Sequence, residues 1–148
     1  MIAALLFAPS PGGDAFCDAL KDSIAQAPRG FPGVSPLLSG ATVGGEGFAC
    51  LVEDNPAGDE TITAPHRDMV CKTALRQVRA GEAEDAQLSA VSAQVEKCIG
   101  PVTDKEHGLI ETPGAWIGVT GVMASASSPT GPWPPPSIST SVTIHAKP

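Results

Sequence analysis

The sequence contains no tyrosine, and its 148 residues include only two tryptophans and four phenylalanines. Glycine and proline are plentiful by comparison, with 16 and 15 copies. The core therefore has to be built mainly from valine, isoleucine, leucine and phenylalanine, in a chain with many tight turns. A chain of this length is expected to form one domain with a modest core.

Positive charge is also scarce. Nine lysines and arginines stand against 16 acidic residues, which gives a formal net charge of -7. This negative net charge does not favour binding to nucleic acid or to an anionic membrane surface. Four basic residues do cluster, but Glu82, Glu84 and Asp85 follow directly, which is typical of a mixed solvated face. The clustered basic residues are Arg67, Lys72, Arg76 and Arg79.

Motifs that carry chemistry are missing as well. There is no C-x-x-C pair, so a zinc site built from cysteine pairs is not expected. The histidines lack H-x-H or H-E-x-x-H spacing, and no serine lies in a G-x-S-x-G turn. Glu46 stands where a phosphate-binding loop needs lysine, and the acids of residues 54–60 lack calcium-loop spacing. The sequence therefore predicts no catalytic residue, no metal and no cofactor.

The three histidines, His66, His107 and His145, are expected in unrelated surroundings. His107 belongs to a polar stretch that reads as a loop. His145 falls on the polar face of the last predicted strand, where a solvated side chain is expected. An enzyme would need a site assembled from residues that are distant in the sequence, such as a pocket that brings His107 or His145 to a carboxylate. We therefore favour a protein without catalytic activity, with a small secreted hydrolase as the lesser alternative.

The chain does contain an even number of widely spaced cysteines: Cys17, Cys50, Cys71 and Cys98. This spacing is typical of two disulfides and of an oxidising compartment. Cys50 and Cys71 each lie in a segment with alternating apolar residues, which predicts two strands joined by a Cys50–Cys71 bridge. Cys17 and Cys98 would then join the two predicted helices.

Placing the two hairpin cysteines opposite each other sets the register of the hairpin. Asp54 then meets Arg67 as an opposite-charge pair. Glu53 meets Asp68 on the other face, an arrangement that is tolerable only in solvent. The further pairs in this register are Phe48–Thr73 and Val52–Met69.

Two helices are predicted, over residues 15–27 and 83–99. In the first, Phe16, Leu20 and Ile24 form an apolar stripe after Asp14, which can cap the helix. In the second, acidic residues crowd the first turn, where they suit the helix dipole, and Gly100–Pro101 ends the helix. Its apolar stripe consists of Leu88, Val91, Val95 and Cys98.

Five strands are predicted: a short edge strand at Leu37 and Leu38, the two hairpin strands, one around residues 117–123, and one over residues 137–146. The strand around 117–123 has apolar residues on both faces, so cover on both faces is expected. The last strand places Ile138, Val142, Ile144 and Ala146 on one face, and its other face is expected to be wet, that is, exposed to solvent. The order α-β-β-β-α-β-β predicts an α+β fold. We expect a disulfide-stapled two-layer sandwich, an antiparallel sheet of four to five strands with two helices on one face.

The first residues have the pattern of a targeting segment. The apolar run 1–9 and the small residues after it look like the core and cleavage zone of a secretory signal, although a basic start is missing. The run is far shorter than the ~20 residues that span a bilayer. We expect residues 1–15 to be a leader remnant or N-terminal anchor, residues 16–148 to form a single domain, and the protein to be secreted or periplasmic.

A long proline-rich connection precedes the last strand. Pro132, Trp133, Pro134 and Pro135 combine a stiff backbone with the residue type that most often dominates interfaces. We therefore expect a protein-binding module, inhibitor-like or immunity-like, that uses this exposed loop against another protein. The competing role for Trp133 is to cover the sheet edge. A second function class is an accessory subunit of a cell-envelope complex, held partly by the apolar N-terminus and touching a membrane only if the leader is retained.

Overall fold

The structure is a computed structural model, and it describes residues 13–32, 42–43, 46–58, 62–78, 81–83, 85–124, 131 and 136–148. The helical elements are α1 (Gly13–Gln26), a 3-10 turn η2 (Ala27–Arg29) and α2 (Ala86–Ile99). The strands are β1 (Thr42–Val43), β2 (Glu46–Asn55), β3 (His66–Thr73), β4 (Arg76–Gln77), β5 (Leu109–Thr112), β6 (Ala115–Ala124) and β7 (Ser137–Ala146).

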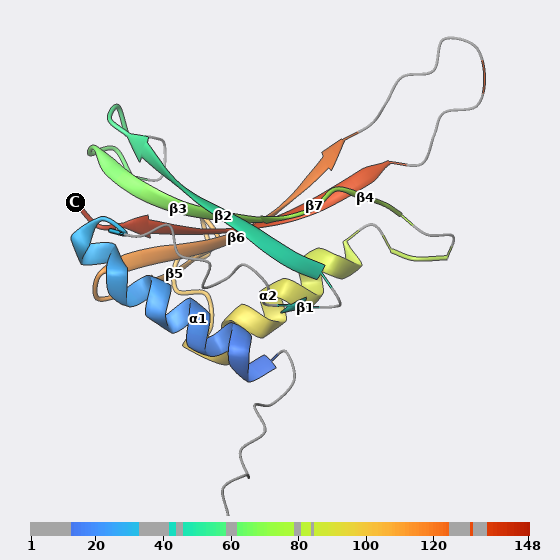
Figure 1. Cartoon of the computed structure of the whole chain (residues 1–148), viewed down its shortest axis with the longest axis horizontal. Coiled ribbons are helices and arrows are strands. Elements are labelled where there is room, and N and C mark those ends of the chain that lie inside the picture. Colours follow the sequence, from blue (N-terminus) through green and yellow to red (C-terminus); the bar gives the residue numbers. More distant parts are fainter. Residues whose placement is uncertain are drawn as a thin grey trace, which may run out of the picture.

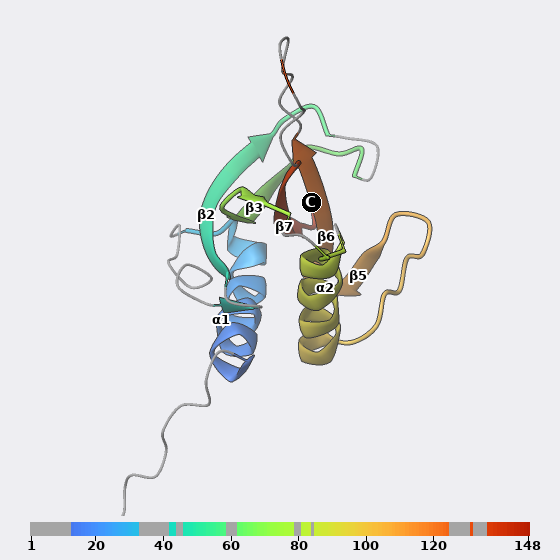
Figure 2. The ribbon, with the colours of Figure 1, turned by 90° about the vertical axis from the view of Figure 1, so that its right-hand side faces the viewer.

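The strands form one antiparallel sheet in the order β1-β2-β3-β7-β6-β5, with β4 paired to β7 beside this path. Figure 1 shows both helices on the same side of the sheet. In Figure 2, α1 lies beneath β2 and α2 lies beneath β6. The predicted α+β class, with two helices covering one face of an antiparallel sheet, is confirmed.

The sheet is larger than the predicted four to five strands, and the predicted element order was wrong. The strand proposed at Leu37 and Leu38 lies outside the described residues. Three short strands were not foreseen: β1, β4 and β5. β1 and β4 have two residues each, and β5 has four. None is long enough for an alternation of apolar and polar residues to predict a strand. Each forms because a longer neighbouring strand offers it backbone hydrogen bonds.

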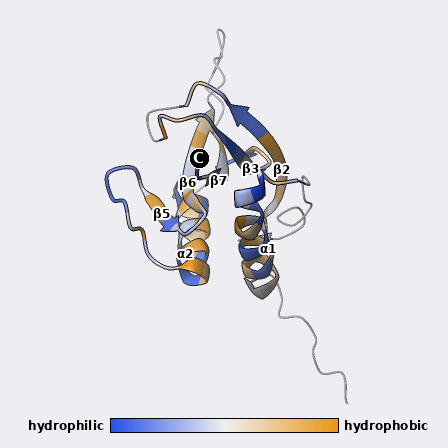
Figure 3. Cartoon of the chain, turned by 90° about the vertical axis from the view of Figure 1, so that its left-hand side faces the viewer, coloured by the Kyte–Doolittle hydropathy of each residue, from blue (hydrophilic) through white to orange (hydrophobic). Residues whose placement is uncertain are grey.

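The β2–β3 hairpin has the predicted register throughout. Cys50 pairs with Cys71, and the two residues are joined by a disulfide with a Cα–Cα distance of 4.0 Å. At the far end of the hairpin, Arg67 Nε donates to Asp54 Oδ1 at 2.6 Å. Figure 3 colours the middle of β2 hydrophobic and its C-terminal end hydrophilic, as expected where the strand leaves the core.

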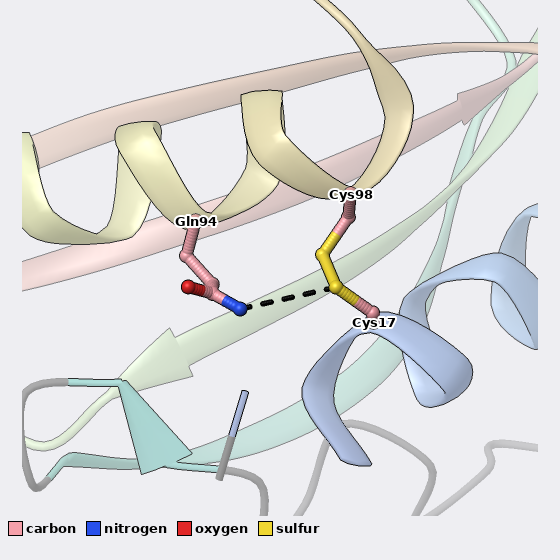
Figure 4. Close-up of a disulfide and its surroundings, with 3 residues drawn as sticks. All are labelled: Cys17, Gln94 and Cys98. Carbon is pink, nitrogen blue, oxygen red and sulfur yellow. Dashed lines mark hydrogen bonds between the residues drawn. A yellow bond between two sulfur atoms is a disulfide. The ribbon is translucent and has the colours of Figure 1, made fainter. Parts of the chain in front are cut away.

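The second disulfide joins the helices, again as predicted. Cys17 on α1 and Cys98 on α2 are bonded at a Cα–Cα distance of 5.3 Å, 81 residues apart in the chain. Gln94, one turn before Cys98, donates from Nε2 to Cys17 Sγ at 3.8 Å (Figure 4). All four cysteines are therefore in disulfides.

The core lies between the helices and the sheet. Phe16 and Leu20 from α1 and Val91 and Val95 from α2 are fully buried. The sheet residues that meet them include Met69, Cys71, Ile117, Val142 and Ile144. Because neighbours along a strand point to opposite faces, this burial defines a helix-facing side and an open side of the sheet.

Some details of the helices differ from the prediction. α1 begins at Gly13, so Asp14 lies inside the helix instead of capping it. α2 begins at Ala86, three residues later than predicted, after an N-cap at Asp85. Leu88 is half-buried because it lies at the edge of the core. Within the described residues, neither 14-residue helix is long and apolar enough to cross a membrane.

The expectation of a wet face on β7 was wrong in part. Ile138, Val142, Ile144 and Ala146 are buried, as predicted. Ser139 and Ser141 are buried too. The side chains of this open face are thus shielded along much of the strand, and the structure places polar groups there in a partly enclosed setting.

Candidate functional site

The predicted binding residues Pro132, Trp133, Pro134 and Pro135 lie outside the described residues. The strands that flank their segment are described. Ala124, the last residue of β6, pairs with Ser137, the first residue of β7. The segment 125–136 therefore leaves and re-enters the sheet at one place, the end of the β6–β7 hairpin.

The exposed apolar residues Leu75, Val122 and Met123 lie at that same end of the sheet, whereas Leu51 lies on β2. Among the described residues, the exposed large hydrophobics are Leu51, Leu75, Val122 and Met123. Val122 and Met123 are 48% and 54% exposed, and Met123 pairs with Ile138 on β7. Leu75 directly precedes Arg76, which pairs with the same Ile138 from the other side. The prediction that this part of β6 is covered on both faces was therefore wrong.

A pocket of about 500 Å³ lies beside these side chains. Leu88, Val122, Met123 and Ile138 supply most of its apolar lining. Leu88 fits tightly against β6 at Gly121, where a Cβ would come within 3.2 Å of Leu88 Cδ2. Volumes of a few hundred cubic ångströms are typical of ligand sites. We call the pocket together with the exposed side chains of Leu75, Val122 and Met123 the hairpin end.

Few polar groups are described at the hairpin end, and they determine the charge of this surface. Thr140 is buried at the pocket and its hydroxyl donates to Gln87 Oε1 at 2.8 Å. Asp85 is exposed in the pocket lining and is the one charged residue among the described residues that line it. Arg76 nearby pairs with Glu82 at 2.8 Å. The pocket is thus apolar with an acidic edge.

A second cluster lies on the open side of the sheet, where two histidines meet one carboxylate. His145 Nδ1 lies 2.8 Å from Asp68 Oδ1, and His66 Nε2 lies 3.3 Å from the same oxygen. The His66 side chain is fully buried, while those of Asp68 and His145 are 10% and 15% exposed. The imidazole rings are in edge-to-face contact with centroids 5.9 Å apart. We call these three residues the His-Asp-His cluster.

Strand pairing builds this cluster. His66 and Asp68 are two residues apart on β3 and so share a face. Asp68 lies opposite His145 on β7 and opposite Glu53 on β2. His145 in turn lies opposite Trp116 on β6. The cluster therefore sits in a cross-strand row that spans most of the sheet.

The expectations for this region need correction. His145 was expected to be solvated and His66 to be unrelated to it, but the two histidines share one carboxylate oxygen. Glu53 does lie opposite Asp68 as predicted, and Glu53 is exposed, but Asp68 is buried. The one signal in the sequence was the H-x-D spacing of His66 and Asp68 within a strand, because the pairing of β3 with β7 cannot be read from local pattern.

The third histidine forms an exposed pair of its own. His107 Nδ1 lies 2.9 Å from Asp104 Oδ2, and the backbone N–H groups of Glu106 and His107 donate to Asp104 Oδ1. The side-chain hydrogen bond from His107, followed by its backbone hydrogen bond, lowers the pKa of Asp104 below its ordinary value. This pair closes the turn before β5.

Comparison with known proteins returns no relative for this chain: no family model, no curated protein and no solved structure matches it.

Proposed function

We propose that this chain is a non-catalytic binding protein of an oxidising compartment, the periplasm or the extracellular space, and that it docks another protein at the hairpin end. The observation that carries the proposal is the apolar pocket at the end of β6, whose lining includes the exposed residues Val122 and Met123. Apolar side chains exposed together beside a hollow mark interaction sites more often than isolated ones do.

The two disulfides support the proposed oxidising compartment. Cys17–Cys98 and Cys50–Cys71 use every cysteine of the chain, and such bridges persist mainly in oxidising surroundings. N-terminal sequencing of the mature protein, together with titration of its free thiols, tests this part of the proposal. A secreted chain that starts near Phe16 supports it, whereas a mature protein with its cysteines reduced contradicts it.

The chemistry of the hairpin end indicates which kinds of side chain its partner should present. The apolar lining accepts an aliphatic or aromatic side chain, which loses contact with water on docking. Asp85 at the edge and the net charge of -7 favour a partner with a basic residue next to that side chain. The partner is thus expected to present an apolar anchor flanked by lysine or arginine.

The segment with Trp133 is expected to contribute to the same surface. It joins β6 to β7 at the hairpin end, and its prolines restrict the backbone, so less entropy is lost when it is clamped. Trp133, ten residues after Met123 in the chain, is then expected to supply a large aromatic contact.

Site-specific photo-crosslinking tests the proposal. A photoreactive residue replaces Met123 in one variant, and in the control variant it replaces Leu51, which is similarly exposed at 48% but lies on β2. Both variants are irradiated in the envelope and secreted fractions of the producing organism. Mass spectrometry then identifies the crosslinked products.

A discrete heterologous protein joined to position 123 and absent from position 51 is the expected result. Equal labelling from the two positions, or no product from position 123, would refute the hairpin end as the binding surface. A product made only of two copies of this chain would refute the proposal that the partner is a different protein.

A further inference from the structure

We propose that the His-Asp-His cluster is a binding site for a divalent transition metal ion of the zinc class. This site is separate from the hairpin end, because it lies at the opposite end of β7 and on the open side of the sheet. The cluster combines two imidazoles and one carboxylate, which is a ligand set that zinc accepts.

The geometry suits one small cation. One ligand atom from each of His66, Asp68 and His145 can be chosen so that all three lie within 4.8 Å of one another. Zinc takes nitrogen and oxygen ligands at about 2.0–2.2 Å, so the ligand atoms of a tetrahedral site lie about 3.4 Å apart. The separation of 3.3 Å between His66 Nε2 and Asp68 Oδ1 is close to that value. The 2.8 Å between His145 Nδ1 and Asp68 Oδ1 is a hydrogen-bond distance, so these two atoms would move apart by about 0.6 Å when they share a zinc ion.

The orientation of His66 is that of a metal ligand. Its Nδ1 lies 2.9 Å from the carbonyl oxygen of Ala64, which can only accept, so the proton of the neutral ring is on Nδ1. The lone pair is then on Nε2, which faces Asp68 Oδ1. A metal ion between Nε2 and Asp68 Oδ1 would be bound by both atoms, whereas in the metal-free protein a second proton on the ring would join them. A backbone carbonyl that holds the other ring nitrogen is the usual support of a metal-binding histidine.

The charges around the cluster also favour a bound cation. Glu53 lies opposite Asp68 and adds a second carboxylate to the row. Among the described residues, the basic side chains next to Asp68 and His145 in the chain are paired elsewhere. Arg67 pairs with Asp54 on the helix-facing side, and Lys147 pairs with Glu111 at 2.6 Å and lies over Trp116. The negative charge of Asp68 is therefore left to the two imidazoles and to a cation between them.

The ligand set also selects among cations. Calcium binds six to eight oxygens, and magnesium keeps an octahedral shell of oxygens and waters. Two nitrogens and one oxygen from a largely buried cluster suit zinc, with a fourth position left for water or for a group from a bound molecule. The competing account is a hydrogen-bonded His-Asp-His network that holds β3 to β7 without any metal.

Isothermal titration of the chelator-treated, disulfide-intact protein with ZnCl2 separates the two accounts. Asp68→Asn removes the shared carboxylate with little change of shape. His145→Gln removes the least buried ligand and so carries the lower risk of misfolding. His107→Gln is the matched control, because it removes a histidine that also pairs with an aspartate but on an exposed turn. The melting temperature of each variant in EDTA reports whether it is folded.

We expect one zinc ion per chain, a dissociation constant raised more than about 100-fold by Asp68→Asn and by His145→Gln, and no change from His107→Gln. Co²⁺ bound at the same stoichiometry should show the visible absorption of a four-coordinate site in the unaltered protein and lose it in both ligand variants. Absence of zinc binding, equal binding by the ligand variants, or equal affinity for Ca²⁺ would overturn the proposal.

Discussion

Asp68 on β3 lies directly opposite His145 on β7, and the two side chains are 2.8 Å apart although 77 residues separate them in the chain. Their meeting depends on the other face of the same two strands, where Met69 pairs with Ile144 and Cys71 with Val142 in the core. A slip of one residue would carry every side chain to the wrong face. Core burial on one side of the sheet thus positions the polar cluster on the other.

The two disulfides should differ in what they contribute to stability. Loop-closure entropy predicts about 4.5 kcal/mol for Cys17–Cys98, which closes a span of 81 residues, and about 3.4 kcal/mol for Cys50–Cys71, which closes 21. The second bridge also joins strands that are already hydrogen-bonded to each other. Urea unfolding of the two double Cys→Ser variants should show the larger loss for Cys17–Cys98. The reverse order would contradict this account.

Val95 tests the packing of α2 on the sheet. Its side chain is fully buried in the core, so Val95→Ala should lower the free energy of unfolding by about 2 kcal/mol, from lost transfer energy and the cavity left behind. Val122→Ala is the same chemical change at an exposed site and should cost less than about 0.5 kcal/mol. Chemical denaturation measures both, and an equal effect would place the α2 stripe outside the core.

Gly58 is required by the turn that leads from β2 to β3. Its φ is +72°, and a Cβ there would lie 2.2 Å from the carbonyl oxygen of Thr63, which is backbone and cannot move aside cheaply. Gly108 has a similar φ of +69° with nothing within 4 Å of such a Cβ. Gly108→Ala should therefore cost about 1 kcal/mol for the left-handed backbone alone, and Gly58→Ala clearly more. Thermal unfolding of both variants provides the comparison.

The Asp104–His107 pair predicts a pH dependence. The pKa of Asp104 is lowered in the folded protein, first by the side-chain hydrogen bond from His107. A carboxyl whose folded pKa lies below its unfolded value of about 3.8 adds stability above that pH, and this stability is lost as pH falls through the folded pKa. NMR titration of the Asp104 carboxyl should give a higher pKa in His107→Gln. An unchanged midpoint would show that His107 has no part in the shift.

Local patterning was sufficient for the parts of the fold that depend on neighbours in sequence. Alternation placed Cys50 and Cys71 in one hairpin, and its register followed from pairing the cysteines. Helical spacing located the buried residues Leu20 and Val95. These signals are strong because a buried face repeats them over several residues.

The candidate sites were harder to predict because they depend on which distant strands pair. β3 is hydrogen-bonded to β7, and the local sequence of neither strand predicts that they pair. The sequence therefore did not predict that His66 and His145 lie close together, and it did not predict that Met123 is exposed. The H-x-D spacing of His66 and Asp68 was the part of the cluster open to sequence reasoning.

The most direct test of the binding account is the affinity of the crosslinked partner for Trp133→Ala, measured together with the melting temperature of the variant. A tryptophan that anchors an interface contributes 2 kcal/mol or more, so the account predicts a dissociation constant raised about 30-fold with a melting temperature unchanged within about 1 °C. An unchanged dissociation constant would contradict the account. If the melting temperature falls while the affinity is preserved, Trp133 packs against its own fold and the account is equally contradicted.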